Sequence, residues 1–387
     1  MNICIVSPDF PTSRSIDFIF VEQLCRALCL KVEKINVIAP QSLTKCLVRR
    51  VPVARKKYCV VVDSGSIFTV YRPKYITVGN VKGVLSRHNK KSFDRAVCRT
   101  LENLKPKPDV IYGHFWQSVR AALPYAVKNK IPLFVASGEE SVSQKRIEYT
   151  DEEVKIMREY LCGAINVSTN NQRECIEAGL HTRKNSIVIP NSVDNSLFKP
   201  ISQKECREKL GLKEDDIVVS FVGQLKHRKG PLRLDDALKK LNNPKIKVCF
   251  IGKGDQTPTY NNIIFQGSVP HSELPVYLSA SDMFVLPTLH EGCCNAIIEA
   301  LACGLPVISS NLPFNYDILN DKNSIMIDPE NVDQIGAAIN ILAESPDKRQ
   351  SMSINAIESA QELTLSNRAD KIISFIQNSI QQNDNDA

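Results

Sequence analysis

Short apolar runs alternate with longer amphipathic segments along most of this chain, and this alternation constrains the fold more than any other feature. The runs are apolar throughout, which is typical of strands in a parallel sheet that is buried on both faces. The predicted strands are residues 3–7, 35–39, 60–62, 67–71, 109–112, 133–136, 164–168, 186–189, 217–222, 247–251, 263–265, 283–286, 307–309 and 325–327. The predicted helices are residues 18–29, 119–128, 231–241, 272–279, 296–302, 332–344 and 348–363. The pattern therefore predicts an α/β protein with doubly wound parallel sheets.

The alternation is interrupted at residues 189–200, where IPNSVDNSLFKP contains two prolines and several turn formers. A chain of 387 residues is also long enough for two domains. We expect a Rossmann-like domain at 1–195, a second one at 196–364, a helix at about 365–380 that packs back on the first domain, and a polar tail at 381–387. Ligands of open α/β sheets bind at the carboxyl ends of the strands, so the predicted site lies between the two domains.

Composition excludes several classes of protein. Apolar residues make up 43% of the chain and charged residues 24%, which is ordinary for a globular protein and not for a disordered one. No apolar run approaches the 18 residues of a membrane-spanning helix, and MNICIVSPDF lacks the basic start of a signal peptide. The thirteen cysteines form no CxxC pair, so we expect reduced thiols, no zinc site and a cytoplasmic protein.

Two carboxylates stand out in EGCCNAIIEALACGLPV, residues 291–307. Glu291 is expected in a loop just before a helix that carries Glu299, and their separation suits two groups of hydroxyls on an elongated polar ligand. The separation is too large for the carboxylate pair of a glycoside hydrolase, which is about 5–9.5 Å. The backbone amides of Cys293, Cys294 and Asn295 fall at the start of the helix, where N–H groups favour anions. A helix-dipole carboxylate and a solvated acid are the structural alternatives.

A second motif, VSFVGQLKHRKGPLRL at 219–234, predicts a strand, a turn at Gly223, a basic loop and a helix. The basic residues Lys226, His227, Arg228 and Lys229 followed by a helix N-terminus favour a diphosphate site, although a solvated basic loop would look the same. The run FIGKGD at 250–255 ends a further strand with Gly252 and Gly254, but it is not the GxGxxG of a dinucleotide site.

The second half of the chain closely resembles the retaining, nucleotide-sugar-dependent glycosyltransferases of family 4 (group 1). Members of that family have the GT-B fold, in which two Rossmann-like domains face each other across a deep cleft. The resemblance is strong over roughly residues 160–345 and looser before them, through FIFVEQLCRAL at 18–28 and DVIYGHFWQS at 109–118. It rests on IPNSVDNSLFKP, VGQLKHRKG, FIGKGD and the long stretch at 263–310, which occur in this order.

The resemblance implies that Lys229 contacts the donor diphosphate, that Glu291 binds hydroxyls of the transferred sugar and that His114 lies near this sugar. We take these three as the catalytic candidates. Further donor contacts are implied for Glu299, which would hold the ribose hydroxyls, and for Gly223, Gln224, Arg228, Asn191, Gly252, Cys293, Cys294 and Asn295. No metal ion and no cofactor beyond the nucleotide-sugar co-substrate are expected.

The chain departs from the family at several positions. Gln224 stands where the family usually has an arginine on the diphosphate, and it lacks that charge and planar fork; Arg228 or Lys226 could compensate. The glycine-rich first loop of the family is missing from SPDFPTSRSIDF at 7–18, and ASGEES at 136–141 lacks a common histidine. These departures fall mainly on the acceptor-facing side.

Charge is distributed unevenly. Residues 1–100 carry 18 basic and 6 acidic side chains, whereas the remainder carries 31 and 36. Most of this surplus lies at 47–57 and 86–95, which suggests either a solvated basic loop or a surface that docks on an anionic membrane or a lipid-diphosphate acceptor. Nucleic acid is disfavoured because few aromatic residues are interleaved.

These inferences together predict a glycosyltransferase that moves a sugar from a UDP- or GDP-sugar to a glycan acceptor. By resemblance the acceptor is lipid-linked, the setting is bacterial surface polysaccharide such as capsule, and the enzyme is cytoplasmic and peripheral on the inner face of the cell membrane. Two alternatives stay open, namely a catalytically weak GT-B scaffold protein and a GT-B sugar-nucleotide epimerase.

Overall fold

The fold is known from a computed structural model that describes residues 1–12, 18–62, 64–78, 84–139 and 141–386. Contacts divide the chain into two compact units. Unit 1 comprises Met1–Val167, Asn171–Ile189 and Arg368–Ala387, and unit 2 comprises Ser168–Asn170 and Pro190–Asn367. Unit 1 is therefore assembled from segments that lie on both sides of unit 2 in the sequence.

Unit 1 is built on an eight-stranded sheet with the order β10-β9-β8-β7-β1-β2-β5-β4. Neighbouring strands are parallel except β4 and β5, which pair antiparallel. The strands are β1 (Asn2–Val6), β2 (Lys34–Ile38), β4 (Lys57–Val61), β5 (Ile67–Tyr71), β7 (Val110–His114), β8 (Leu133–Ser137), β9 (Leu161–Asn166) and β10 (Ser186–Val188). A small separate sheet pairs β3 (Gln41–Ser42) with β6 (Lys74–Tyr75).

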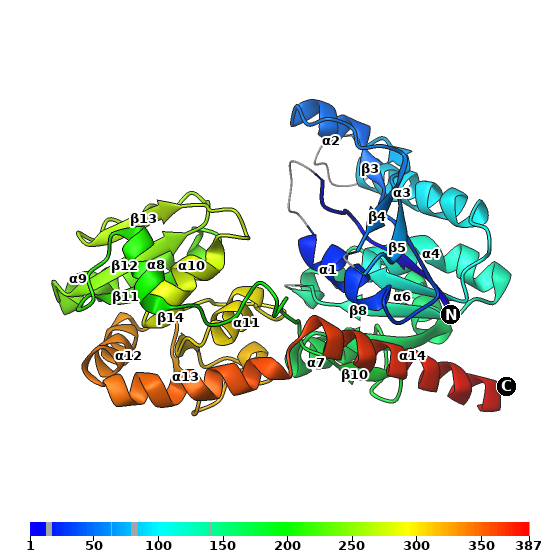
Figure 1. The fold of residues 1–387 in the computed structure, drawn as a ribbon. Coiled ribbons are helices and arrows are strands. Elements are labelled where there is room, and N and C mark those ends of the chain that lie inside the picture. Colours follow the sequence, from blue (N-terminus) through cyan, green and yellow to red (C-terminus); the bar gives the residue numbers. More distant parts are fainter. Residues whose placement is uncertain (13–17, 63, 79–83, 140, 387) are drawn as a thin grey trace. The chain divides into compact units, whose positions relative to one another are not determined.

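Helices cover this sheet and bury its apolar strands (Figure 1). Helix α2 (Leu43–Val48) is not among them, because it contacts β3 and has no buried residue. The covering helices are α1 (Ile19–Leu28), α3 (Val84–Glu102), α4 (Trp116–Asn129), α5 (Val142–Arg146), α6 (Asp151–Tyr160), α7 (Thr169–Glu177) and α14 (Leu365–Asp386). The last of them returns to unit 1 from the far end of the sequence. Its Phe375 ring meets the Phe134 ring edge-on at 6.1 Å, and it packs so closely on β9 that a Cβ at Gly163 would lie 2.7 Å from it.

Unit 2 has a six-stranded, wholly parallel sheet with the order β13-β12-β11-β14-β15-β16. Its strands are β11 (Ile217–Val222), β12 (Ile246–Ile251), β13 (Ile263–Gly267), β14 (Met283–Leu286), β15 (Val307–Ser310) and β16 (Ser324–Ile327). Its helices are α8 (Gln203–Leu210), α9 (Pro231–Leu241), α10 (Leu274–Ala280), α11 (Asn295–Ala302), α12 (Val332–Glu344) and α13 (Pro346–Gln361), with 3-10 turns at His227–Lys229 and Pro313–Asn315.

The predicted α/β fold with doubly wound parallel sheets is confirmed, but several local features differ from the predictions. The basic run 86–95 is part of helix α3 and not a loop. Residues 381–386, predicted as a polar tail, continue helix α14. The edge strand β4 pairs antiparallel with β5. Among the described residues, no helix is both long enough and apolar enough to span a membrane.

Candidate active site

The motif residues of unit 2 gather where two neighbouring parallel strands end. After β11 the chain passes Gly223 and a basic 3-10 turn before α9 starts at Pro231, and the loop after β14 lies against this turn. Gly230 connects the turn to α9 with φ 79°, and a Cβ there would lie 2.5 Å from the Pro287 carbonyl oxygen. The Leu289 amide donates to the Arg228 carbonyl oxygen at 2.8 Å, which fixes the two loops together. Only glycine fits at position 230.

Glu291 is the centre of the polar contacts in this site. Its Oε1 lies 2.5 Å from Lys229 Nζ and 2.9 Å from Arg228 Nη1, and it accepts a hydrogen bond from Thr288 Oγ1 at 2.7 Å. The residue is only 8% exposed, and Thr288 is fully buried. One carboxylate thus holds two cations on the turn after β11, in a largely desolvated environment.

Electrostatics keep the Lys229 ammonium charged. Burial acts to lower the pKa of Lys229, but Cys294 and Glu291 outweigh it, so the pKa is raised and the ammonium stays charged. Burial raises the pKa of Cys294, only partly offset by Lys229, so this thiol is neutral at pH 7 and Glu291 is the effective partner of Lys229. Two cations therefore share the Glu291 carboxylate in this cluster.

The start of α11 is held by Asn191, which lies in the segment between the last strand of unit 1 and α8. Its Nδ2 donates to the Cys293 carbonyl oxygen at 3.0 Å and to Asn295 Oδ1 at 2.8 Å. Cys294 is the N-cap residue of this helix and is buried. The structure therefore brings Asn191, Cys293, Cys294 and Asn295 together, at the helix N-terminus that follows Glu291.

Glu299 takes part in a different contact. It lies on α11, and its Oε1 is 2.9 Å from His271 Nε2. This hydrogen bond raises the pKa of His271, against the effect of partial burial, and the histidine ring also packs on Phe198 with ring centroids 5.0 Å apart. Glu299 is thus held in place by a partner that motif reading did not identify.

Close backbone approach explains the glycines of the neighbouring loops. A Cβ on Gly252, whose φ is 152°, would lie 1.8 Å from the Gly223 carbonyl oxygen. Gly223 itself lies beside the Lys229 side chain, with its ideal Cβ position 3.6 Å from Cδ. The loops after β11 and β12 are therefore in direct contact, and Gln224 lies exposed between them. Arg228 is the neighbouring cation that contacts Glu291, whereas Lys226 is exposed.

His114 belongs to unit 1, where it is the last residue of β7 at the carboxyl edge of the sheet. It is 4% exposed and lies among the rings of Phe20, Tyr112 and Phe115. Burial, helped by Arg368, lowers its pKa to about 3, so the imidazole is neutral. Within the described part of the chain its Nε2 has no hydrogen-bond partner.

Sequence reasoning missed Thr288 and His271. Thr288 had a weak local signal, because it lies three residues before Glu291 in the same loop. His271 had none, because it meets Glu299 across separate segments. In the regions that the structure describes, no group of three or more histidine, cysteine, aspartate or glutamate residues is arranged to hold a metal ion.

Solved structures with similar folds identify the fold. Sucrose-phosphate synthase from Thermosynechococcus elongatus matches with a TM-score of 0.77 and 16% identity, over 99% of this chain and 100% of that one. Anabaena Alr3699/HepE, solved in complex with UDP and glucose, matches with a TM-score of 0.71 and 16% identity, over 97% and 99%. The fold is the GT-B fold of glycosyltransferases, with two Rossmann-like domains.

Sequence comparison adds a family match within unit 2. Residues 202–359, which include Lys229, Glu291 and Glu299, match the family of glycosyl transferases group 1. TuaC of Bacillus subtilis, named for teichuronic acid biosynthesis, is 29% identical over 275 residues, which are 70% of each chain. An Escherichia coli UDP-Gal:α-D-GlcNAc-diphosphoundecaprenol α-1,3-galactosyltransferase is 34% identical over 180 residues, 42% of this chain and 45% of that protein. The chain is a glycosyltransferase, and we call residues 202–359, which match the group 1 family, the group 1 segment.

Proposed function

We propose that this glycosyltransferase belongs to family 4 and transfers a sugar, with retention at the anomeric carbon, from a UDP- or GDP-sugar to a lipid-linked glycan. The observation that carries the proposal is the Glu291 cluster, in which Lys229 and Arg228 share one buried carboxylate inside the group 1 segment. Two neighbouring cations in a desolvated turn suit a diphosphate, and the fixed carboxylate beside them suits sugar hydroxyls.

The roles follow from this arrangement. Lys229 offsets the negative charge that builds on the diphosphate as the bond between the anomeric carbon and the phosphate oxygen breaks. The backbone amides at the start of α11 bind oxygens of the donor, Glu291 orients the sugar and Glu299 holds the ribose. The acceptor hydroxyl forms the new bond on the face that the phosphate leaves, and the departing phosphate oxygen takes its proton. No residue then has to act as a covalent nucleophile, and no metal ion is required.

The acceptor and the setting rest on the relatives and on unit 1. The named acceptor of the Escherichia coli relative is a sugar on diphosphoundecaprenol, and TuaC is named for a surface polymer. In unit 1, Leu47 and Val48 on helix α2 are 79% and 77% exposed and are followed by Arg49 and Arg50. Exposed apolar side chains beside cations suit an anionic bilayer surface. We therefore place the enzyme in the cytoplasm, peripheral on the cell membrane, in capsule or related polysaccharide synthesis.

Donor binding is the direct test. Thermal unfolding of the full chain is followed with UDP, GDP and a panel of their sugars at millimolar concentration, and a donor raises Tm by mass action. Lys229→Ala should abolish the shift, whereas Glu358→Gln, an exposed change on α13 of the same unit, should leave it intact. The proposal fails if no nucleotide or nucleotide sugar shifts Tm. Hydrolysis or transfer from the donor identified in this way then separates an enzyme from a scaffold.

A further inference from the structure

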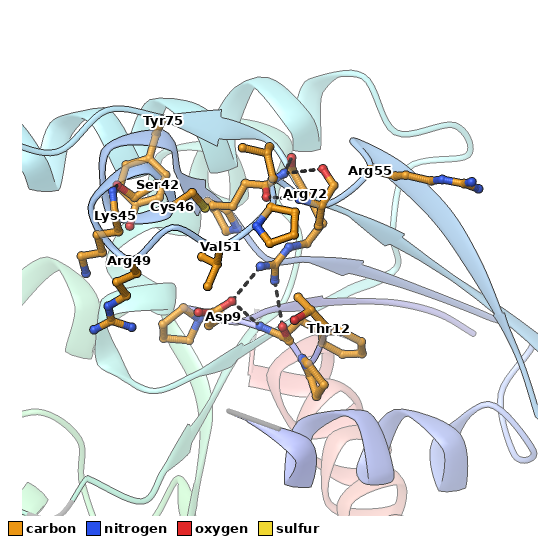
Figure 2. A pocket seen from close by; sticks show the side chains of 18 of the residues that line it. Asp9, Thr12, Ser42, Lys45, Cys46, Arg49, Val51, Arg55, Arg72 and Tyr75 are labelled. Atoms are coloured by element: carbon orange, nitrogen blue, oxygen red, sulfur yellow. Dashed lines mark hydrogen bonds and ion pairs between the residues drawn. The ribbon is translucent and has the colours of Figure 1, made fainter. Parts of the chain in front are cut away.

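Unit 1 contains a pocket of about 660 Å³ (Figure 2). Its walls come from the segments that follow β1, β2 and β5, together with α2 and residues 49–55. These three strands are neighbours and parallel, so their carboxyl ends lie at one edge of the sheet, the same edge as His114 at the end of β7. This is the edge at which open α/β sheets bind ligands.

The walls of the pocket are fixed by side-chain hydrogen bonds. The Gln41 amide donates to the Ala54 carbonyl oxygen at 2.9 Å and accepts from the Ala54 amide at 2.9 Å. It also donates to the Arg72 carbonyl oxygen at 3.1 Å. Ser42 Oγ and Thr77 Oγ1 are 2.7 Å apart at the start of α2. The irregular segment 51–55 is therefore anchored to the sheet edge by the buried Gln41, so this wall of the pocket is held in place by hydrogen bonds.

The acidic residues of the pocket already have cationic partners. Asp9 Oδ1 lies 2.8 Å from Arg72 Nη2, and Glu22 Oε1 lies 2.6 Å from Arg26 Nη2. Lys45, Arg49 and Arg55 also line the pocket, and no ion pair is recorded for them among the residues that the structure describes. Lys45 and Arg49 are one helical turn apart, and Figure 2 shows both side chains at the same end of the pocket, with Arg55 extending away at the other. The pocket thus has a surplus of positive charge.

Arg72 adds a second and independent indication of a ligand. Its side chain is 4% exposed and lines the pocket, and its Nη atoms donate to Asp9 and to the Phe10 carbonyl oxygen. Its Nε has no hydrogen-bond partner within the described chain. A buried N–H donor without an acceptor is costly, and an oxyanion in the pocket would satisfy it.

We propose that this pocket binds the phosphate or diphosphate group of the acceptor, with Lys45 and Arg49 as the main cations and Arg72 as the buried donor. This assignment rests on the proposed function, because it names the part of the lipid-linked acceptor that unit 1 recognises. Arginine and lysine suit phosphate oxygens, and Val51 and Val53 provide apolar surface for the hydrocarbon next to it. Part of the excess of basic residues in unit 1 would then serve to bind the phosphate or diphosphate of the acceptor.

Titration calorimetry of the full chain with inorganic pyrophosphate tests the site. The donor site is silenced with Lys229→Ala, so that the remaining binding reports on the pocket. In that background K45A/R49A should weaken pyrophosphate binding by about tenfold or more. The matched control R50A/K56A removes the same charge from exposed residues of the same basic run that do not line the pocket, and it should change the Kd by less than about twofold. All four of these cations are exposed, and thermal melts verify that the variants fold.

Two results would overturn the site: loss of all pyrophosphate binding in Lys229→Ala alone, or equal weakening by the two double variants. Geranyl diphosphate, a short soluble polyprenyl diphosphate, distinguishes the source of the phosphate. It should compete with pyrophosphate at this site, and failure to compete would mean that the pocket takes free phosphate and not an acceptor. If pocket binding persists while no donor is bound or turned over, the proposed function is wrong and the phosphate site stands.

Discussion

Replacing Glu291 by glutamine should destabilise the unliganded protein and yet tighten its binding of a nucleoside diphosphate. The substitution keeps an acceptor oxygen for Thr288 but leaves Lys229 and Arg228 without their shared negative charge. Removing one partner of a buried ion pair costs roughly 3–5 kcal/mol. Because the Arg228 side chain is still 29% exposed, we expect about 2 kcal/mol, or a fall in Tm of roughly 4–8 °C for a unit of this size.

A bound diphosphate supplies the missing charge, so the penalty should disappear in the complex. In the unliganded wild-type protein Glu291 competes with the diphosphate for Lys229, and the glutamine variant has no such competition. The affinity for UDP or GDP, whichever binds, should therefore rise by roughly tenfold, the equivalent of 1.4 kcal/mol. Sugar transfer should nevertheless fall, because the glutamine holds the sugar hydroxyls less firmly.

Differential scanning fluorimetry and calorimetric titration of wild type, Glu291→Gln and the control Glu358→Gln measure both effects. Glu358 is exposed on α13, so its substitution should leave Tm and affinity unchanged. If the affinity of Glu291→Gln for the nucleoside diphosphate falls together with its stability, the competition between carboxylate and diphosphate is refuted.

Three further outcomes are expected. Gly252→Ala should lower the free energy of unfolding by several kcal/mol, since its Cβ would lie 1.8 Å from the Gly223 carbonyl oxygen. The control Gly211→Ala should cost only about 1 kcal/mol, because nothing lies within 4 Å of its Cβ. Similar urea midpoints for the two variants would contradict the clash at Gly252. His114 has a pKa of about 3 when folded, so unfolding takes up a proton between the usual pKa near 6.5 and that value. The free energy of unfolding therefore falls as pH falls through this window, by up to about 1.4 kcal/mol per pH unit. In thermal melts from pH 7 to 4, His114→Gln should show a weaker dependence of stability on pH. Asn191→Ala removes two hydrogen bonds at the start of α11, so it should lower the free energy of unfolding by about 1–2 kcal/mol and weaken donor binding. Unchanged donor affinity would show that this helix end does not contact the donor.

The central strands of both sheets were predictable to within a few residues, because a strand buried on both faces is apolar along its whole length. Helix α3 was not, because its exposed face carries the basic run 86–95 and its apolar periodicity is weak. Helix α6 was also missed, although Thr150 and Glu153 form a capping box that marks its start. The antiparallel pairing of β4 with β5 has a sequence signal, because only residues 62–66 separate the two strands and a parallel pair would need a longer crossover.

The residues of the candidate site were predictable where they occur together in one short motif. Glu291, Lys229 and Arg228 occur in two short runs, and the structure joins those runs through neighbouring strands. Short motifs could not predict two other features, namely the contact of His271 with Glu299 and the Nε of Arg72, which has no partner among the described residues. Each depends on segments that are far apart in the sequence, and no local pattern records which side chains meet.

The return of α14 to unit 1 has a consequence for synthesis on the ribosome. Unit 2 is complete in the growing chain before Arg368 has been made, whereas unit 1 still lacks the helix that covers Phe134 and Gly163. Unit 1 is thus finished after unit 2, although most of it is made earlier, and an apolar patch on its sheet is open until then. Translation to residue 367 should accordingly yield a nascent chain whose second half resists protease while its first half is cut.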